Sequence, residues 1–440
     1  MLNRRALEIW IQAAGRLMRS LMRLPKTWKV FCLMPWLGLH VSKRGEASPC
    51  CIFRRESSVG NLQESTFQEL WNSPGMRDVR GNMLSGRPSP GCESCYKRES
   101  YGFLTTRLWS LAHFVRHLPR AAYTPDDGFA GSFRMPYMDI RFSNRCDLRC
   151  RMCDPVGSSG WYQDSRRLSV WTPKGLLRPM KDPEDLWRQI EPLLPSLEEV
   201  SFSGGEPLLM DEHYRLLDRL LELRLFHVRL RYTTSFSTTH HGGRDVMRLW
   251  DRFDRVAVVA SLDASGRRGE YLRKGLVWEQ VVRNRRRMFE TCPRVDFRVS
   301  ATLTAMNALH LPDFHREWVE NGFIALRGLK INPLFIPEEY QARLLPKRLK
   351  LLATEKYQEH IDRFIRPHDP LDRLHLRSAE RRFKAAASFL ETASGPHELA
   401  AFKVKTLELD RLRGEDFTDV FPELAEMMGE PTPDCDKRAA

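Results

Sequence analysis

The sequence predicts an α/β fold: a partial, TIM-type barrel of six β/α units between a cysteine-rich N-terminal module and a helical C-terminal extension. From Tyr137 to about Leu334, strand-like and helix-like apolar patterns alternate, which indicates a parallel sheet. About 200 residues suit six such units better than the eight of a complete barrel. After residue 337 the chain is helical in pattern and rich in charge.

Six segments carry strand signals, as alternating apolar residues or short apolar runs. They lie at residues 138–142, 200–202, 228–232, 256–260, 295–303 and 329–333. Apolar residues at helical spacing follow the later strands, at residues 214–221, 246–253, 278–288 and 314–323. A further helix, ending near Leu193, is predicted in the long first connection.

The composition is that of a soluble globular protein. Of 440 residues, 42% are hydrophobic and 29% charged, and the length allows a full core. Seventy basic residues against fifty-six acidic ones give a formal charge of +14, which would favour nucleic acid or an acidic substrate. The basic residues are scattered and no nucleic-acid motif lies among them, so we favour a solvated basic surface.

Residues 1–30 predict an amphipathic basic helix, with apolar residues such as Leu7 and Trp10 among Arg4 and Arg5. Such a helix either lies on a membrane surface or docks onto its own protein, and we favour docking. It lacks the uncharged core of a signal peptide, and no stretch approaches the ~20 apolar residues that span a bilayer.

Grouped cysteines in a large chain without a secretory signal indicate metal in a reducing compartment, so we expect a cytoplasmic protein.

Three cysteines share one short loop after the first strand. Cys146, Cys150 and Cys153 are separated by three and then two residues. Three thiolates can ligate three irons of a [4Fe–4S] cluster and leave the fourth iron open to a small molecule. The alternative is a set of buried or zinc-binding cysteines, but structural zinc closes with four ligands. We favour the cluster, and an open iron indicates a catalytic one.

Polar residues also follow four later strands, at the edge where the working residues of α/β sheets gather. They are Ser203–Pro207, Thr233–Thr234, Ser261–Asp263 and the group Thr302, Thr304 and Asn307. The two glycines of Ser203–Pro207 suit a positive φ or a closely approaching ligand, and Glu206 could accept hydrogen bonds from an ammonium group. Ser261 and Asp263, each taken alone, could equally form a turn and a helix cap.

The motif Cys-x3-Cys-x2-Cys, followed downstream by Gly-Gly-Glu-Pro, resembles the radical S-adenosylmethionine (SAM) superfamily over residues 137–334. The resemblance implies a [4Fe–4S] cluster on Cys146, Cys150 and Cys153 whose open iron is chelated by SAM. One electron then cleaves SAM to methionine and a 5′-deoxyadenosyl radical, which abstracts a substrate hydrogen atom.

The same resemblance assigns further roles. Met152 would lie beside the adenine, and Gly204, Gly205 and Glu206 would meet the methionyl amino group. The residues implied near the ribose and carboxylate are Ser261, Asp263, Thr302 and Asn307. Thr233-Thr234 departs from the Asn-Thr pair often found at that strand end.

Upstream cysteines resemble the auxiliary-cluster module called SPASM, or twitch in its short form. The similarity lies in a Gly45-x4-Cys50 hairpin, the segments Gly60–Leu62 and Leu70–Asn72, and Cys92–Cys95. It implies one auxiliary iron–sulfur cluster, with Cys32, Cys50, Cys92 and Cys95 as ligands and Cys51 as the alternate to Cys50. Here the module precedes the barrel, which it commonly follows. The alternative is a zinc ribbon on the same cysteines.

The predicted division is a helix at 1–30, the auxiliary module at 31–100, a linker at 101–134, the barrel at 135–336 and the extension at 337–440. We expect a radical SAM oxidoreductase or maturase with a peptide substrate, reduced by a reductase or a flavodoxin- or ferredoxin-type donor. One alternative is a radical SAM enzyme acting on tRNA, a sugar or another small molecule. The other is a basic, zinc-containing nucleic-acid-binding protein.

Overall fold

The structure, a computed structural model, describes residues 29–368, 373–393 and 396–429. The helix predicted over residues 1–30 therefore lies, but for its last two residues, outside the described residues. The chain forms two compact units. Of the described residues, those of the first unit lie within 29–100, 104–140 and 178–200, and those of the second within 101–103, 141–177, 201–368, 373–393 and 396–429.

The first unit joins the cysteine-rich module to the first predicted core strand. Strands β1 (His40–Val41), β2 (Glu46–Ser48) and β3 (Gly60–Asn61) pair in antiparallel fashion, and β1 also pairs in parallel with β4 (Tyr137–Ile140). Its helices are α2 (Phe67–Trp71), α3 (Pro74–Leu84), α4 (Glu93–Ser100), α5 (Thr106–His113), α6 (Leu118–Ala122) and α8 (Pro183–Ile190). Because of the β1–β4 pairing, the module and the linker that follows it pack as one body with β4.

Local polar contacts hold the start of this module. Thr66 caps α2 through a capping box with Glu69, which satisfies two free backbone N–H groups at the start of the helix. Arg80 on α3 is fully buried and donates to Pro35 O at 2.9 Å and to Asn72 Oδ1 at 2.9 Å. This ties the segment that carries Cys32 to α3.

The second unit contains a parallel sheet whose strands are the later ones predicted. β7 (Arg229–Thr234), β10 (Val256–Ala260), β12 (Asp296–Leu303) and β13 (Leu329–Pro333) pair in parallel, in the order β13-β12-β10-β7. Strand β6 (Glu199–Phe202) crosses the division of the chain between the units. All six predicted strands are present within two residues of the predicted ends, and the α/β class is confirmed.

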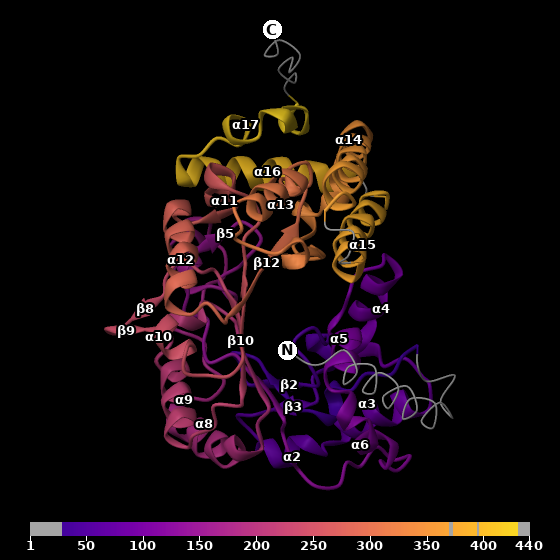
Figure 1. Cartoon of the computed structure of the whole chain (residues 1–440), viewed down its shortest axis with the longest axis vertical. Coiled ribbons are helices and arrows are strands. Elements are labelled where there is room, and N and C mark those ends of the chain that lie inside the picture. The colour runs from indigo at the N-terminus through magenta and orange to yellow at the C-terminus, as the bar shows by residue number, and fades with distance from the viewer. Residues whose placement is uncertain (1–28, 369–372, 394–395, 430–440) are drawn as a thin grey trace. The chain divides into compact units, whose positions relative to one another are not determined.

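Helices cover the strands of the second unit. They are α9 (Asp211–Glu222), α10 (Val246–Trp250), α12 (Trp278–Thr291) and α13 (Leu311–Glu320), each following a predicted strand. Figure 1 shows α9, α10 and α12 along one side of β10. Tyr232 of β7 stacks on Phe202 at 4.9 Å between ring centroids and contacts Trp250 at 5.0 Å, while its hydroxyl bonds His213 at 2.9 Å. Part of the apolar core of this unit thus lies between β7 and the helices α9 and α10.

The predicted C-terminal extension is helical. It comprises α14 (Lys347–His360), a π-helical turn (Ile361–Ile365), α15 (Arg373–Leu390), α16 (Pro396–Arg413) and α17 (Phe417–Val420). In Figure 1 these elements, orange to yellow, form a group beside α11 (Gly266–Leu272) and α13. Phe417 contacts Phe402 and Phe421, which in turn meets Tyr271 of α11 at 5.5 Å. Among the described helices, none combines the length and apolar character needed to cross a membrane.

A buried histidine pair joins α13 to α14. His315 Nε2 donates to Leu326 O at 2.8 Å, so its Nδ1 accepts from His360 Nε2, 2.9 Å away. Burial lowers the pKa of His315 to about 4 and the pKa of His360 to about 3. Both rings are therefore neutral in the folded protein near neutral pH.

We predict that this pair makes stability depend on pH. In the unfolded chain both histidines take up protons below about pH 6.5, whereas the folded pair resists protonation down to about pH 4. The free energy of unfolding should hold above pH 6.5 and fall below it, by about 1.4 kcal/mol per pH unit for each histidine. Denaturant titrations between pH 7.5 and 4.5 measure this slope. H315Q/H360Q should flatten it, whereas H227Q at an exposed position should not; equal slopes would contradict the prediction.

Candidate functional site

The loop with three cysteines is held by backbone contacts and by glycines. Cys150 lies in β5 (Arg149–Cys150), which pairs in antiparallel fashion with β11 (Arg273–Lys274). Cys150 O accepts from Trp161 Nε1 at 2.8 Å and from Cys153 N at 3.0 Å. A Cβ atom added at Gly157 would lie 2.5 Å from Cys153 Sγ, so the following turn packs directly against that thiol.

The three thiols form no disulfide and lie in a poorly solvated place. Cys150 is buried, and Cys146 and Cys153 are half-buried. Burial raises the pKa of Cys146 and of Cys150, and the Cys150 thiolate raises that of Cys146 further because the two negative charges would repel. A thiolate at such a place requires positive charge beside it, which iron supplies, so the donor set fits an iron–sulfur cluster.

Within the described ranges, no three His, Cys, Asp or Glu side chains converge on a point that could hold one metal ion. A four-iron cluster makes no such demand, because each of its cysteines ligates a different iron.

The Gly204-Gly205-Glu206 turn lies against the cysteine loop. Gly204 and Gly205 have positive φ angles of 85° and 47°, the conformation for which glycine is suited. A Cβ atom at Gly205 would lie 2.3 Å from Arg145 O, and Glu206 N donates to the same oxygen at 2.7 Å. The two glycines therefore allow close contact between this turn and the residue preceding Cys146.

The Glu206 carboxylate is fully buried and accepts four hydrogen bonds. Oε1 accepts from Thr234 Oγ1 at 2.6 Å and Leu208 N at 3.1 Å, and Oε2 accepts from Ser235 N at 2.6 Å and Ser235 Oγ at 2.7 Å. Burial raises the pKa of Glu206, and these four donors oppose that rise. Both carboxylate oxygens are thus occupied by the chain itself. One of these donors is Thr234, which belongs to the Thr233-Thr234 pair found where the family often has Asn-Thr.

Three other predicted site residues form one network. Asp263 Oδ1 accepts from Thr302 N at 2.7 Å, and Asn307 Nδ2 donates to Asp263 O at 3.0 Å and to Thr302 O at 2.9 Å. Ser261 N donates to Thr234 O at 2.7 Å, which links this strand end to the previous one. Met152 is partly exposed in the turn between Cys150 and Cys153.

The upstream cysteines line a pocket in the first unit. Its walls are Cys32, Cys50, Ile52, Phe53, Gly91, Cys92, Cys95 and Arg107. Burial raises the pKa of Cys32 to about 11 and that of Cys92 to about 12, while the Arg107 guanidinium acts against this at Cys32. The neighbouring cysteines raise the pKa of Cys50, in addition to burial. Four thiols in one buried pocket fit a cluster, and Cys51 is exposed and does not line it.

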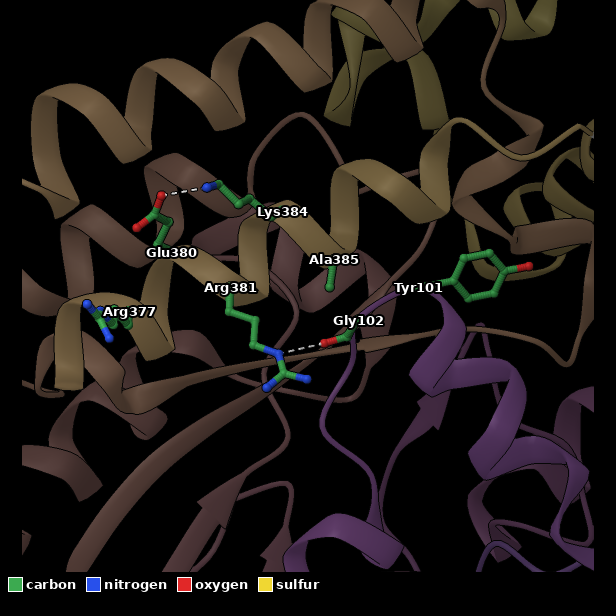
Figure 2. A pocket seen from close by; sticks show the side chains of 7 residues that line it. All are labelled: Tyr101, Gly102, Arg377, Glu380, Arg381, Lys384 and Ala385. Carbon is green, nitrogen blue, oxygen red and sulfur yellow. Dashed lines mark hydrogen bonds and ion pairs between the residues drawn. The ribbon is translucent and has the colours of Figure 1, made fainter. Parts of the chain in front are cut away.

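A separate pocket of about 290 Å³ in the second unit contains no cysteine (Figure 2). It is lined by Tyr101, Gly102, Arg377, Glu380, Arg381, Lys384 and Ala385. Arg381 Nε donates to Gly102 O at 3.0 Å, and Lys384 pairs with Glu380 at 2.7 Å. Three cationic side chains against one carboxylate make this pocket electropositive.

Two family descriptions match the sequence over these sites. Residues 140–316 match the radical SAM superfamily, and residues 32–96 match SPASM, an iron–sulfur cluster-binding domain. The chain therefore contains a radical SAM domain and a SPASM domain. The cofactors of the radical SAM chain are a [4Fe–4S] cluster with SAM, and an auxiliary iron–sulfur cluster in the SPASM domain. The predicted recognition of radical SAM and SPASM domains and the predicted cofactors are confirmed.

Several solved structures are similar to the radical SAM chain. Native anSMEcpe with bound AdoMet and Kp18Cys peptide has a TM-score of 0.37 and 19% identity over 52% of this chain and 61% of that one. SuiB of Streptococcus suis bound to S-adenosylmethionine has a TM-score of 0.35 and 17% identity over 74% and 69%. SuiB bound to precursor peptide SuiA has a TM-score of 0.32 and 16% identity over 64% and 59%.

The chain spans less than two thirds of the length of the anSMEcpe chains it matches. No protein of curated function matches the sequence.

Sequence reasoning missed Arg273. The side chain is buried, its Nε lies 2.8 Å from Asp263 Oδ2, and its Nη1 donates to Cys150 Sγ at 3.7 Å. Although burial alone would lower the pKa of Arg273, the Asp263 carboxylate and Cys150 raise it. Arg273 belongs to no sequence motif, so the sequence did not indicate its role. The pairing of β11 with β5 brings Arg273 next to Cys150.

We predict that E206Q destabilises the radical SAM core. An amide nitrogen cannot accept a hydrogen bond, so one pair of donors around residue 206 would lose its acceptor. The free energy of unfolding should fall by about 1–3 kcal/mol. Denaturant unfolding measures this, with E222Q as the control because Glu222 forms only an exposed pair with Arg219. Equal values for the two variants would refute the proposed bonding.

We predict that Cys50 and Cys51 behave differently. C50S should remove the iron of the auxiliary cluster because Cys50 lines the pocket, whereas C51S, at the exposed neighbouring position, should retain it. Iron and sulfide counts after anaerobic reconstitution provide the measurement. Loss of iron in C51S, with retention in C50S, would reverse the assignment.

Proposed function

We propose that the chain is a radical SAM enzyme that cleaves SAM reductively and abstracts a hydrogen atom from its substrate. When bound, the cluster and SAM supply one electron and a 5′-deoxyadenosyl radical for that abstraction. The observation that carries the proposal is the contact between the cysteine loop and the Gly204-Gly205-Glu206 turn through Arg145 O. This contact supports the proposal because it joins the loop of Cys146, Cys150 and Cys153 to the glycine turn within the second unit.

The residues of the chain would bind and orient the cofactors. Cys146, Cys150 and Cys153 would ligate the cluster, and Gly204 and Gly205 would meet the methionyl amino group. For Glu206 we propose a positioning role, since four donors of the chain already occupy its carboxylate. It would hold the glycine turn against the strand end at Thr234 and Ser235.

We propose that the strand ends after β10 and β12 hold the ribose and carboxylate of SAM. Ser261, Asp263 and Thr302 would provide the polar groups, and Met152 would lie beside the adenine. Asn307 is fully buried and accepts from Thr304 N at 2.8 Å, which supports a role in shaping this loop.

We propose an auxiliary cluster on Cys32, Cys50, Cys92 and Cys95 that ligates the substrate or accepts an electron from the substrate radical. Four thiols around one pocket support this assignment. A flavodoxin- or ferredoxin-type donor in the cytoplasm would supply the electron for SAM cleavage.

A peptide with acidic residues is the substrate class that we propose. Its support is the formal charge of +14, together with the electropositive pocket around Arg377, Arg381 and Lys384. Electrostatic attraction of this kind speeds encounter and weakens as salt screens it.

We predict that the reconstituted protein holds two clusters and cleaves SAM. C146A/C150A/C153A should lose about four irons and retain the others, and the unmodified chain, unlike this triple variant, should release 5′-deoxyadenosine with SAM and dithionite. Iron analysis and chromatography of the products measure both. The double variant C32A/C95A should lose the auxiliary iron and keep the rest. An iron count unchanged by the triple substitution, or zinc in place of iron, would overturn the proposed function.

A further inference from the structure

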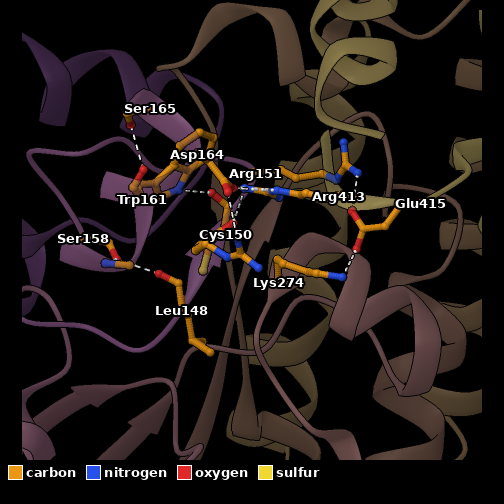
Figure 3. A network of polar contacts seen from close by, with 12 residues as sticks. Leu148, Cys150, Arg151, Ser158, Trp161, Asp164, Ser165, Lys274, Arg413 and Glu415 are labelled. Carbon is orange, nitrogen blue, oxygen red and sulfur yellow. Dashed lines mark hydrogen bonds and ion pairs between the residues drawn. The ribbon is translucent and has the colours of Figure 1, made fainter. Parts of the chain in front are cut away.

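Arg151 lies within the cysteine motif but extends away from it, toward the C-terminal end of the second unit (Figure 3). Its side chain is 1% exposed. Nη2 donates to Glu415 Oε2 at 2.7 Å and to Asp410 Oδ1, and the guanidinium carbon lies 3.6 Å from the centroid of the Tyr271 ring. The Tyr271 hydroxyl donates to the same Asp410 oxygen at 2.8 Å. A residue between two cluster cysteines is thus paired with acids that follow it by more than 250 positions.

Arg413 makes the reverse connection, from the end of α16 to the loop. Its side chain is fully buried; Nε donates to Asp164 Oδ2 and Nη2 to Arg149 O, each at 2.9 Å. The guanidinium carbon also lies 4.9 Å from the ring of Trp161. Trp161 in turn donates to Cys150 O, so Arg413 supports the backbone of the cluster loop from two sides.

The same C-terminal stretch also contacts the partner strand of β5. Glu415 Oε1 pairs with Lys274 Nζ at 3.0 Å, and Lys274 lies on β11 beside Arg273, which contacts Cys150 Sγ. Asp410 Oδ2 accepts from Phe417 N at 2.8 Å, which links the acids to the start of α17. Residues 410–415 therefore contact both strands of the two-stranded sheet that carries Cys150.

The buried ion pairs oppose separation of residues 410–415 from the cysteine loop. Arg151 and Lys274 face the carboxylates of Asp410 and Glu415, while Arg413 faces Asp164. Withdrawal of the C-terminal stretch would leave Arg151 buried with neither acid, and an unpaired buried charge is strongly destabilising. The stretch also lies outside residues 140–316, the region that matches the radical SAM superfamily.

We propose that residues 410–415 are a positioning element of the cluster loop. Asp410 and Glu415 fix Arg151, and Arg413 fixes the backbone of Arg149 and the Trp161 that supports Cys150. This inference rests on the proposed function, because it concerns the same cluster. It assigns the C-terminal extension the task of holding the loop in the conformation that retains the cluster and presents it to SAM.

The test compares D410N/E415Q with E426Q. The double variant keeps side-chain size but removes both acids from Arg151, whereas Glu426 belongs to the same extension and pairs with Arg348 instead. After anaerobic reconstitution of the full chain, a ferrous chelator should remove the four SAM-cluster irons at least about tenfold faster from D410N/E415Q, as expected when the partners of ligating residues are lost. The auxiliary iron should leave at the unmodified rate.

Electron paramagnetic resonance of the reduced protein gives a second measure, apart from activity. The signal of the SAM cluster, and its change on addition of SAM, should differ between D410N/E415Q and E426Q at equal iron content. R413Q should release iron faster than R413K, because lysine keeps the positive charge. R413K should still release iron faster than the unmodified chain, because lysine lacks the fork geometry with which arginine bonds two separate oxygens.

Iron release and spectra of D410N/E415Q that match those of E426Q would overturn the proposal. If the double variant fails to fold, R413Q decides the question, and release from R413Q at the unmodified rate would overturn it. Failure of the proposed function is distinguishable, because then C146A/C150A/C153A would contain as much iron as the unmodified chain.

Discussion

A buried thiolate needs positive charge beside it, and both cysteine sites of this protein are arranged around that need. Burial raises the pKa of Cys146 and Cys150 in one site and of Cys32, Cys50 and Cys92 in the other. Each site also has a buried arginine, Arg273 next to Cys150 and Arg107 near Cys32, which favours the ionised thiol. Iron supplies the remaining charge, so the same burial that disfavours bare thiolates makes these places suitable for clusters.

Around Cys146, Cys150 and Cys153, buried polar groups of the chain bond to one another and hold the loops in place. Glu206 accepts from three donors on Thr234 and Ser235 at the end of β7 and from Leu208 N, and Asp263 bonds Thr302 and pairs with Arg273. Fully bonded buried carboxylates fix the backbone around them, because breaking one bond leaves an unsatisfied group in a poorly solvated place. Close backbone approach at Gly205 adds to this rigidity.

The C-terminal extension connects to the radical SAM core through charge. Arg151, Arg413 and Lys274 meet Asp410, Asp164 and Glu415 over a short stretch, and aromatic contacts from Tyr271 to Phe421 and Phe417 surround that stretch. In the first unit, by contrast, the SPASM module joins β4 through backbone hydrogen bonds of β1. The two additions to the core thus use different physical interactions.

The sequence by itself determined where the six strands lie along the chain, the cysteine motifs and the polar strand ends, because each depends on residues close together in the chain. Apolar periodicity located all six strands, the spacing of Cys146, Cys150 and Cys153 predicted an iron–sulfur cluster, and the resemblance of this motif together with Gly-Gly-Glu-Pro implied the family. Only the tertiary structure decided that Glu206 is occupied by Thr234 and Ser235, that Arg273 reaches Cys150, and that Arg151 pairs with Asp410. These contacts join residues from 28 to 259 positions apart, and no local pattern marks which distant acid or hydroxyl a buried group will meet.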